Sequence, residues 1–179
     1  MKLLFRILLL ISALLVVFLV IGMMLPSQLQ VESSSRIKTT VNNVYVQLID
    51  YKTMPAWLSW STKDRTMVYR YEGSDAGVGT IMHWQSQNPE ISNGSQKIIE
   101  AETDKYVKNI IAMNGMPRAY SSFRLTSNND HTVVNWRFDM QFGFNIPARI
   151  RGLFLRDIIE QHYRKSLKNL KIYLEQKKL

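Results

Sequence analysis

Residues 132–140 read Thr-Val-Val-Asn-Trp-Arg-Phe-Asp-Met, and this stretch determines the fold class. Val134, Trp136, Phe138 and Met140 alternate with side chains that are mostly polar. Successive side chains of a strand point to opposite faces of the sheet. The pattern therefore predicts an antiparallel strand with one face in a core and the other face in water.

Other segments with extended patterns precede this strand. Clusters of Gly, Asn, Asp, Ser and Pro separate them, and such clusters favour turns. Neighbouring strands joined by short turns indicate an antiparallel meander. The expected strands cover residues 66–72, 80–87, 95–102, 105–113 and 119–126, with turns at 73–79, 88–94, 114–117 and 127–130.

The C-terminal region predicts one long amphipathic helix, because apolar residues recur at intervals of three and four while most basic residues lie off that stripe. The stripe consists of Leu155, Ile159, Tyr163, Leu167, Leu170 and Leu174. Upstream, residues 29–40 are expected to be extended. Two short helices are expected next, one after Thr40 as N-cap and one within residues 54–60. The predicted class is α+β, a helix-grip fold in which a curved antiparallel β-sheet wraps on the long C-terminal helix.

The N-terminal region contains a membrane-spanning pattern. Ile7 to Leu25 is a nineteen-residue run without a charge. At ~1.5 Å per residue it covers ~28 Å, close to the ~30 Å hydrocarbon core of a bilayer. We expect residues 1–28 to form a transmembrane anchor and residues 29–179 one domain. A cleaved signal peptide is the alternative, although no small-x-small cleavage site closes the run.

Charge determines the expected orientation and partners. Lys2 and Arg6 flank the first end of the run, so the positive-inside rule places the C-terminal domain on the outer side, periplasmic or extracytoplasmic. The net charge is +9, and residues 149–179 contain nine basic and three acidic residues. We expect this basic helix to contact anionic lipid or to form a solvated face, and we expect no nucleic-acid partner. The chain has no cysteine, which excludes disulfides.

Five short motifs occur in an order that resembles a known superfamily. They are Pro55-Ala56-Trp57-Leu58-Ser59-Trp60, then Gly73 to Gly79 followed by Trp84, then Val133-Val134-Asn135-Trp136, Gly152-Leu153-Phe154 and Leu167-Lys168-Asn169-Leu170. Together they resemble the SRPBCC or START-like superfamily, and more narrowly bacterial membrane-anchored proteins described as polyketide cyclase/dehydrase-like. The resemblance implies a helix-grip fold with a deep apolar cavity for lipids, sterols, polyketides or other hydrophobic molecules. It carries no catalytic motif onto this chain.

Aromatic, methionine and aliphatic side chains are the candidates to line such a cavity, although core packing is the alternative for each of them. Phe142 and Phe144, between the last strand and the helix, are also candidates for a gate or a membrane contact. The candidate ligand-binding residues are Trp57, Trp60, Met67, Tyr69, Tyr71, Trp84, Phe123, Trp136, Phe138, Met140, Phe142, Phe144, Leu155, Ile159 and Tyr163.

Catalytic and metal-binding patterns are scarce. His83, His131 and His162 lack the spacing of metal ligands, so we expect neither a metal nor a cofactor. His83 or His162 could serve as a general base, and Glu100 with Glu102 could form a carboxylate pair, but a solvated face is the simpler interpretation. The glycines at 73–79 match no phosphate-binding pattern and predict a turn with positive φ.

Three functions remain open from the sequence. The leading hypothesis is a membrane-tethered binding module for a hydrophobic, lipid-like ligand held between sheet and helix. The second is a polyketide cyclase-like or other enzyme that uses the same cavity. The third is a ligand-free structural or interaction domain of the cell envelope, with protein partners that the sequence does not identify.

Overall fold

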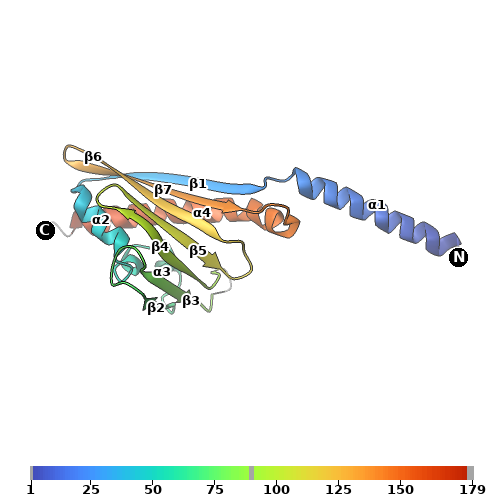
Figure 1. Ribbon diagram of the computed structural model, residues 1–179, viewed down its shortest axis with the longest axis horizontal. Coiled ribbons are helices and arrows are strands. Elements are labelled where there is room, and N and C mark those ends of the chain that lie inside the picture. Colours follow the sequence, from blue (N-terminus) through green and yellow to red (C-terminus); the bar gives the residue numbers. More distant parts are fainter. Residues whose placement is uncertain (1, 89–90, 177–179) are drawn as a thin grey trace.

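The computed structural model describes residues 2–88 and 91–176, and within them a curved seven-stranded sheet wraps on one long helix (Figure 1). Positions 89–90 of the expected turn, Met1 of the expected anchor and positions 177–179 of the expected domain lie outside the described residues. The elements are α1 (Lys2–Met24), β1 (Gln28–Ile37), α2 (Val41–Ile49), η1 (Met54–Ala56), α3 (Ser59–Lys63), β2 (Val68–Glu72), β3 (Ile81–Gln85), β4 (Gly94–Glu102), β5 (Tyr106–Met113), β6 (Ala119–Asn128), β7 (His131–Gln141) and α4 (Ile146–Gln176).

The sheet is antiparallel throughout, with the order β1-β7-β6-β5-β4-β3-β2. Strands β2 to β7 form the expected meander, since each pairs with the next in the chain. β1 instead lies beside β7, in register from Gln28 opposite Gln141 to Ile37 opposite Thr132. The α+β helix-grip class is therefore confirmed, and β1 is the strand that packs most extensively on α4.

The short helices between β1 and β2 begin where the sequence predicts. The hydroxyl of Thr40 accepts a hydrogen bond from the backbone N–H of Asn43 and so caps α2. The second predicted helical turn is divided into η1 and α3, with the fully buried Trp57 between them. These segments cover the part of the concave face that α4 does not reach.

The turn from β2 to β3 contains glycines in the left-handed region, with φ of +81° at Gly73, +77° at Gly77 and +96° at Gly79. L-amino acids with side chains rarely adopt this conformation. The segment connects two strands and precedes no helix, so the predicted turn is confirmed and a phosphate-binding loop is excluded.

The core lies between the concave face of the sheet and α4. The inward side chains of β7 predicted by alternation, Val134, Trp136, Phe138 and Met140, are all at most 6% exposed. From α4 they meet the predicted apolar stripe, whose members from Ile159 to Leu174 are buried. The apolar face of β7 and the apolar stripe of α4, both predicted from the sequence, thus pack against each other.

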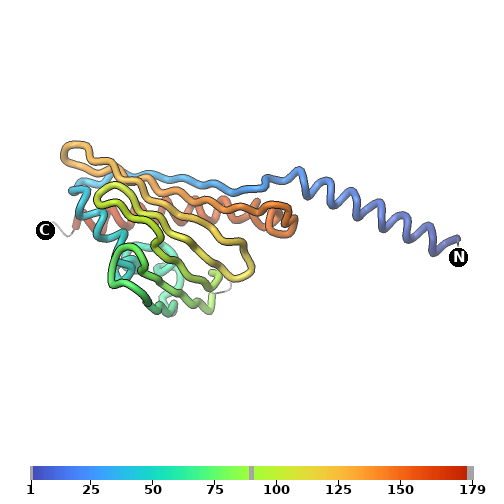
Figure 2. The backbone as a smooth tube through the Cα atoms, viewed as in Figure 1, coloured from blue at the N-terminus to red at the C-terminus, as the bar shows by residue number. Residues whose placement is uncertain are grey.

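Helix α1 leaves the domain at the end where α4 begins (Figures 1 and 2). It is long and apolar enough to cross a membrane, with a mean hydropathy of 3.1 over its most apolar window. Its last turn contacts α4, because Gly22 packs against Ile146 and the guanidinium of Arg149 donates to the carbonyls of Met23 and Leu25. Helix α1 is therefore fastened to the start of α4.

We predict that Leu170→Ala lowers the free energy of unfolding by about 2–5 kcal/mol, the usual cost of truncating a buried leucine. Leu170 is fully buried on α4. Lys168→Ala, at an exposed position of the same helix, is the matched control and should change stability by less than about 0.5 kcal/mol. Denaturant unfolding of the full chain in detergent measures both, and equal small effects would contradict the packing of α4 on the sheet.

Candidate functional site

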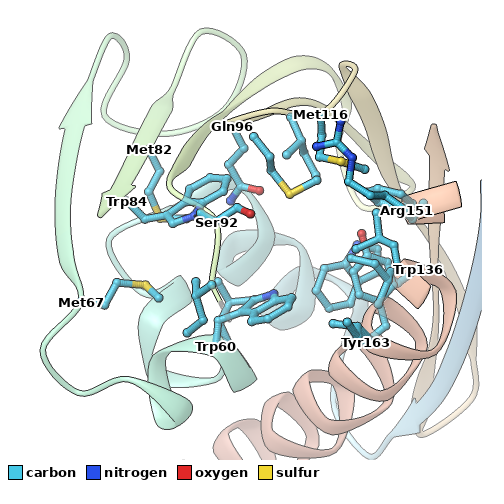
Figure 3. A pocket seen from close by; sticks show the side chains of 18 of the residues that line it. Trp60, Met67, Met82, Trp84, Ser92, Gln96, Met116, Trp136, Arg151 and Tyr163 are labelled. Atoms are coloured by element: carbon cyan, nitrogen blue, oxygen red, sulfur yellow. Dashed lines mark hydrogen bonds between the residues drawn. The ribbon is translucent and has the colours of Figure 1, made fainter. Parts of the chain in front are cut away.

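A cavity of about 280 Å³ lies between the sheet and the first half of α4 (Figure 3). It forms because the strands β3 to β5 curve away from the helix while β7 stays in contact with it. Specific ligand pockets usually have volumes of ~300–1,000 Å³. The cavity is therefore at the small end of that range, sufficient for one compact apolar molecule or one chain of a lipid.

The lining is formed by segments that are distant in sequence. β7 and α4 form one wall, β2 to β5 form the opposite wall, and the connections after η1 and β3 complete it. The lining residues are Leu58, Trp60, Met67, Tyr69, Met82, Trp84, Ile91, Ser92, Gln96, Ile111, Met113, Met116, Trp136, Phe138, Arg151, Phe154, Leu155, Ile158, Ile159 and Tyr163.

Aromatic stacking stiffens one wall of the cavity. The Trp136 ring lies 3.7 Å from that of Tyr163 and 4.6 Å from that of Phe123, centroid to centroid, and nearly parallel to the first. The indole N–H of Trp136 donates to Ser121 Oγ at 2.7 Å, and the Tyr163 hydroxyl donates to the same oxygen at 3.3 Å. Both polar tips thus point into the sheet, and the rings face the cavity with their apolar surface.

Two further polar groups of the lining also have hydrogen-bond partners within the protein. The indole N–H of Trp84 donates to the carbonyl of Ser92 at 2.7 Å. The hydroxyl of Tyr69 lies 2.7 Å from Ser61 Oγ. Because these atoms already have partners, the cavity offers few free hydrogen-bonding groups and favours an apolar occupant.

Nine of the fifteen candidate residues from the sequence line this cavity. Six do not, for three different reasons. Trp57, Phe123 and Met140 are packed in the core behind the lining, and Phe142 is buried against Gly152. Phe144 is 84% exposed outside the cavity, and Tyr71 lies beyond it at the outer end of β2. The nine that line it are Trp60, Met67, Tyr69, Trp84, Trp136, Phe138, Leu155, Ile159 and Tyr163.

Sequence reasoning missed several lining residues. Met82, Ile111 and Met113 share the inward face of β3 and β5, and strand alternation from Trp84 and from the buried Val107 would have identified them. Leu58, Ile91 and Met116 come from irregular connections, where no periodicity indicates direction. Arg151 gives the lining one cation, and its guanidinium donates to the carbonyl of Gly115 at 2.7 Å.

His162 does not line the cavity, but Trp60, on which its imidazole stacks, does. The centroids of the two rings are 3.3 Å apart. His162 Nδ1 lies 2.6 Å from the hydroxyl of Ser59, which is fully buried. A buried serine is inaccessible to a substrate, so the pair joins α3 to α4 and does not form a nucleophile and base.

The remaining candidate catalytic groups lie outside the cavity. His83 pairs with Glu72 across β2 and β3 at 3.3 Å, on the face opposite Trp84. Glu100 and Glu102 pair with Lys108 and Lys105 respectively, at exposed positions, so the solvated interpretation of these carboxylates holds. Within residues 2–88 and 91–176, no three His, Asp or Glu side chains are grouped to hold a metal ion.

A second hollow, of about 480 Å³, lies on the outer face of strands β2 to β5. It includes Arg70, His83 and Asn114, whose side chains face solvent. No helix covers this face, so the hollow has a single wall (Figure 1). The cavity between the sheet and α4, which has walls on both sides, is therefore the better candidate site.

Comparison with known proteins identifies the family. The family model described as "Polyketide cyclase / dehydrase and lipid transport" matches residues 28–175. The chain belongs to this family. The match covers the sheet and α4, including every residue of the cavity, and it confirms the resemblance drawn from the sequence motifs. No curated protein sequence matches the chain.

Solved structures share the fold of this family member at low sequence identity. Protein SA2116 from Staphylococcus aureus, whose structure is titled as of unknown function, aligns with a TM-score of 0.62 and 12% identity over 84% of this chain and 96% of its own. Protein NE0264 from Nitrosomonas europaea gives 0.61 and 16% identity over 84% and 96%. Protein XoxI from Bacillus cereus gives 0.59 and 16% over 84% and 98%. These likenesses establish the fold and leave the ligand open.

We predict that His162 makes stability fall in acid. Burial lowers the pKa of His162 from 6.5 to about 4, with Lys63 and Lys165 adding to the effect. The unfolded chain therefore binds more protons than the folded chain between these values, and stability decreases as pH falls from about 6.5 to about 4. Because the ring is only half-buried, we expect a loss of roughly 1–2 kcal/mol.

Chemical unfolding of the full chain across this pH range, compared with His162→Gln, measures the effect. The variant keeps a hydrogen-bonding group near Ser59 but cannot titrate, so its stability should depend less on pH. Identical pH profiles for the two proteins would show that His162 has no part in the acid sensitivity.

Proposed function

We propose that this protein is a membrane-tethered binding module that holds a hydrophobic, lipid-like ligand between its sheet and α4. The observation that carries the proposal is the composition of the cavity wall. Leu58, Met82, Ile111 and Ile159 supply aliphatic surface, and the indole N–H groups of Trp84 and Trp136 are hydrogen-bonded within the protein. Transfer of an apolar ligand from water to such a surface is favourable by about 25 cal/mol per Å².

The methionines of the lining add adaptability. Met67, Met82, Met113 and Met116 have unbranched side chains that accommodate ligands of different shape. Arg151, at one end, can pair with an anionic headgroup while the apolar part enters. The proposed ligand class is therefore an amphiphile with one apolar chain or a compact apolar body.

An enzyme of the polyketide cyclase type is the alternative suggested by the family description. The described lining contains no histidine, aspartate or glutamate for proton transfer. Its two tyrosines, Tyr69 and Tyr163, are hydrogen-bonded, and burial raises the pKa of each hydroxyl. These groups are poor general acids and bases at neutral pH, which favours binding over catalysis.

A ligand-free structural domain is the third alternative. A filled core would serve such a role, whereas this domain leaves about 280 Å³ open beside fully buried aromatic residues. An unfilled apolar cavity lowers stability, because the residues around it lose packing contacts. The open volume therefore favours a ligand.

The membrane half of the proposal rests on α1. Arg149, only 6% exposed, holds the carbonyls at the C-terminal end of this helix. Removal of α1 as a signal peptide would leave that buried cation without these partners, which is costly. The contact supports a retained anchor, and Lys2 and Arg6 before the apolar run support an outer location of the domain.

We predict that Ile111→Trp reduces the amount of bound lipid by about tenfold, which corresponds to about 1.4 kcal/mol of lost binding free energy. Ile111 points into the cavity, whereas the adjacent Ile110 points to the opposite face of β5. Ile110→Trp is therefore the matched control and should retain the ligand. Extraction of the purified full chain, followed by mass spectrometry of the extract, measures the occupancy, and an empty wild-type protein would refute the proposal.

We also predict the side of the membrane on which the domain lies. Alkaline phosphatase fused after Leu179 should be active, because it requires export, and a fluorescent protein that folds only in the cytoplasm should stay dark there. Arg6→Glu together with Lys2→Glu weakens the orientation signal and should reduce the exported fraction. Fluorescence of the wild-type fusion would show the opposite orientation.

A further inference from the structure

Exposed apolar side chains gather at the end of the domain from which α1 leaves. Phe144, in the connection between β7 and α4, is 84% exposed, and Phe154 and Leu153, within the first three turns of α4, are 71% and 48% exposed. Single exposed apolar residues are common, but a cluster of large ones marks an interaction surface. We call Phe144, Leu153 and Phe154 the anchor-side face.

The exposed positions of α4 change in character along the helix. Near the anchor they include Leu153, Phe154 and Ile158, the last two of which also line the cavity. Farther along, most exposed positions are polar or basic, at Gln161, Arg164, Lys165 and Lys168, with Ile172 as the exception. A solvated helix keeps polar residues on its open face throughout. The part of α4 near the anchor therefore lacks the composition of a surface that faces only water.

The position of this face relative to α1 is fixed by a buried contact. Carbonyls at the end of a helix lack partners within the helix, and a cation is favourable there. Arg149 donates to the carbonyls of Met23 at 2.7 Å and Leu25 at 3.0 Å, and also to that of Gly143 at 2.8 Å. A Cβ at Gly22 would lie 2.4 Å from the side chain of Ile146, so the close approach of the two helices requires glycine there.

The cavity lining extends to the same end of the domain, and we take its mouth to lie there. Its rim includes Arg151 and Phe154 from α4 and Met116 from the turn between β5 and β6, and the labelled side chains of Arg151 and Met116 lie close together above the cavity (Figure 3). In Figure 1 this turn and the start of α4 both lie at the end of the domain from which α1 extends. A bilayer crossed by α1 would therefore face the mouth of the cavity.

We propose that this end of the domain docks on the bilayer that α1 crosses, with the anchor-side face in the interfacial region and the cavity mouth toward the lipid. The 23 residues of α1 cover ~34 Å, enough to fill the hydrocarbon core and bring Met24 to the headgroups. The anchor-side face lies next to this end of α1. Interfacial apolar side chains penetrate the bilayer by ~5–10 Å, so the face can enter the interfacial region. The inference rests on the proposed function, since it requires α1 to span the membrane.

Charge around the rim suits this arrangement. One arginine, Arg151, lines the cavity, and two more, Arg118 and Arg156, are close in sequence to lining residues. Asp157 is the one acidic residue within 144–158. Cations beside an apolar face are attracted to anionic headgroups. The contact with anionic lipid that the sequence suggested for the basic helix is thereby assigned to its first three turns. A ligand could then pass between bilayer and cavity without crossing bulk water.

Site-directed spin labelling of the full chain tests the docking. The chain has no cysteine, so Phe144→Cys, Phe154→Cys and Ile172→Cys each create one labelling site. The labelled proteins are placed in nanodiscs of phosphatidylethanolamine and phosphatidylglycerol, and collisions with oxygen and with a water-soluble nickel complex are compared. Labels at 144 and 154 should favour oxygen, and the label at 172, an exposed apolar position at the far end of α4, should favour nickel.

Arg149→Gln in the Phe154→Cys protein should shift that label from oxygen toward nickel, because the hold on α1 is lost. Arg164→Gln, which removes an exposed arginine farther along the same helix, is the matched control and should leave the label unchanged. Thermal unfolding of each variant shows that it is folded.

Nickel access at both 144 and 154 would overturn the docking, and so would the absence of access to either reagent, which would mean that a protein covers this face. Aqueous labels on a protein that still carries extracted lipid would refute the docking and leave the ligand-binding proposal intact. Oxygen access on a protein without bound lipid would support the docking while the ligand-binding proposal failed.

Discussion

The need to cover the apolar stripe of α4 shapes the whole domain. The concave face of the sheet covers that stripe completely from Ile159 to Leu174, where the side chains are at most 5% exposed. Toward the start of the helix, strands β2 to β5 leave the apolar cavity between themselves and α4. One constraint thus produces both parts of the molecule, a closed core at one end and an open apolar cavity at the other. The aromatic group around Trp136 lies where the two parts join.

Periodicity predicted the elements well and the site only in part. The alternation in β7 and the stripe of α4 each identified a buried face, because backbone geometry alone fixes those directions. The start of α4 at Ile146 was missed, since its first turns expose Leu153 and Phe154 and so lack an amphipathic pattern. Trp57 and Trp60 are alike in sequence, yet the irregular backbone between η1 and α3 directs one into the core and the other into the cavity.

Arg149 illustrates a contact that sequence reasoning could not find. In the sequence, Arg149 was only one member of a basic C-terminal region. In the structure it binds backbone carbonyls more than a hundred residues earlier. Every residue has a backbone carbonyl, so the sequence does not indicate which carbonyls a side chain binds. Only the folded structure reveals the pairing. The contact gives α1 a defined position relative to the domain and its cavity.

The central claim is that a hydrophobic ligand occupies the cavity, and methyl NMR of the methionines tests it most directly. Met67, Met82, Met113 and Met116 line the cavity, whereas Met140 is buried outside it and serves as an internal reference. The full chain labelled with ¹³C at its methionine methyl groups is delipidated in detergent and then titrated with its own lipid extract. The account predicts that the four lining methyl signals shift while that of Met140 stays in place. Unchanged lining signals, or shifts confined to methionines elsewhere, would contradict it.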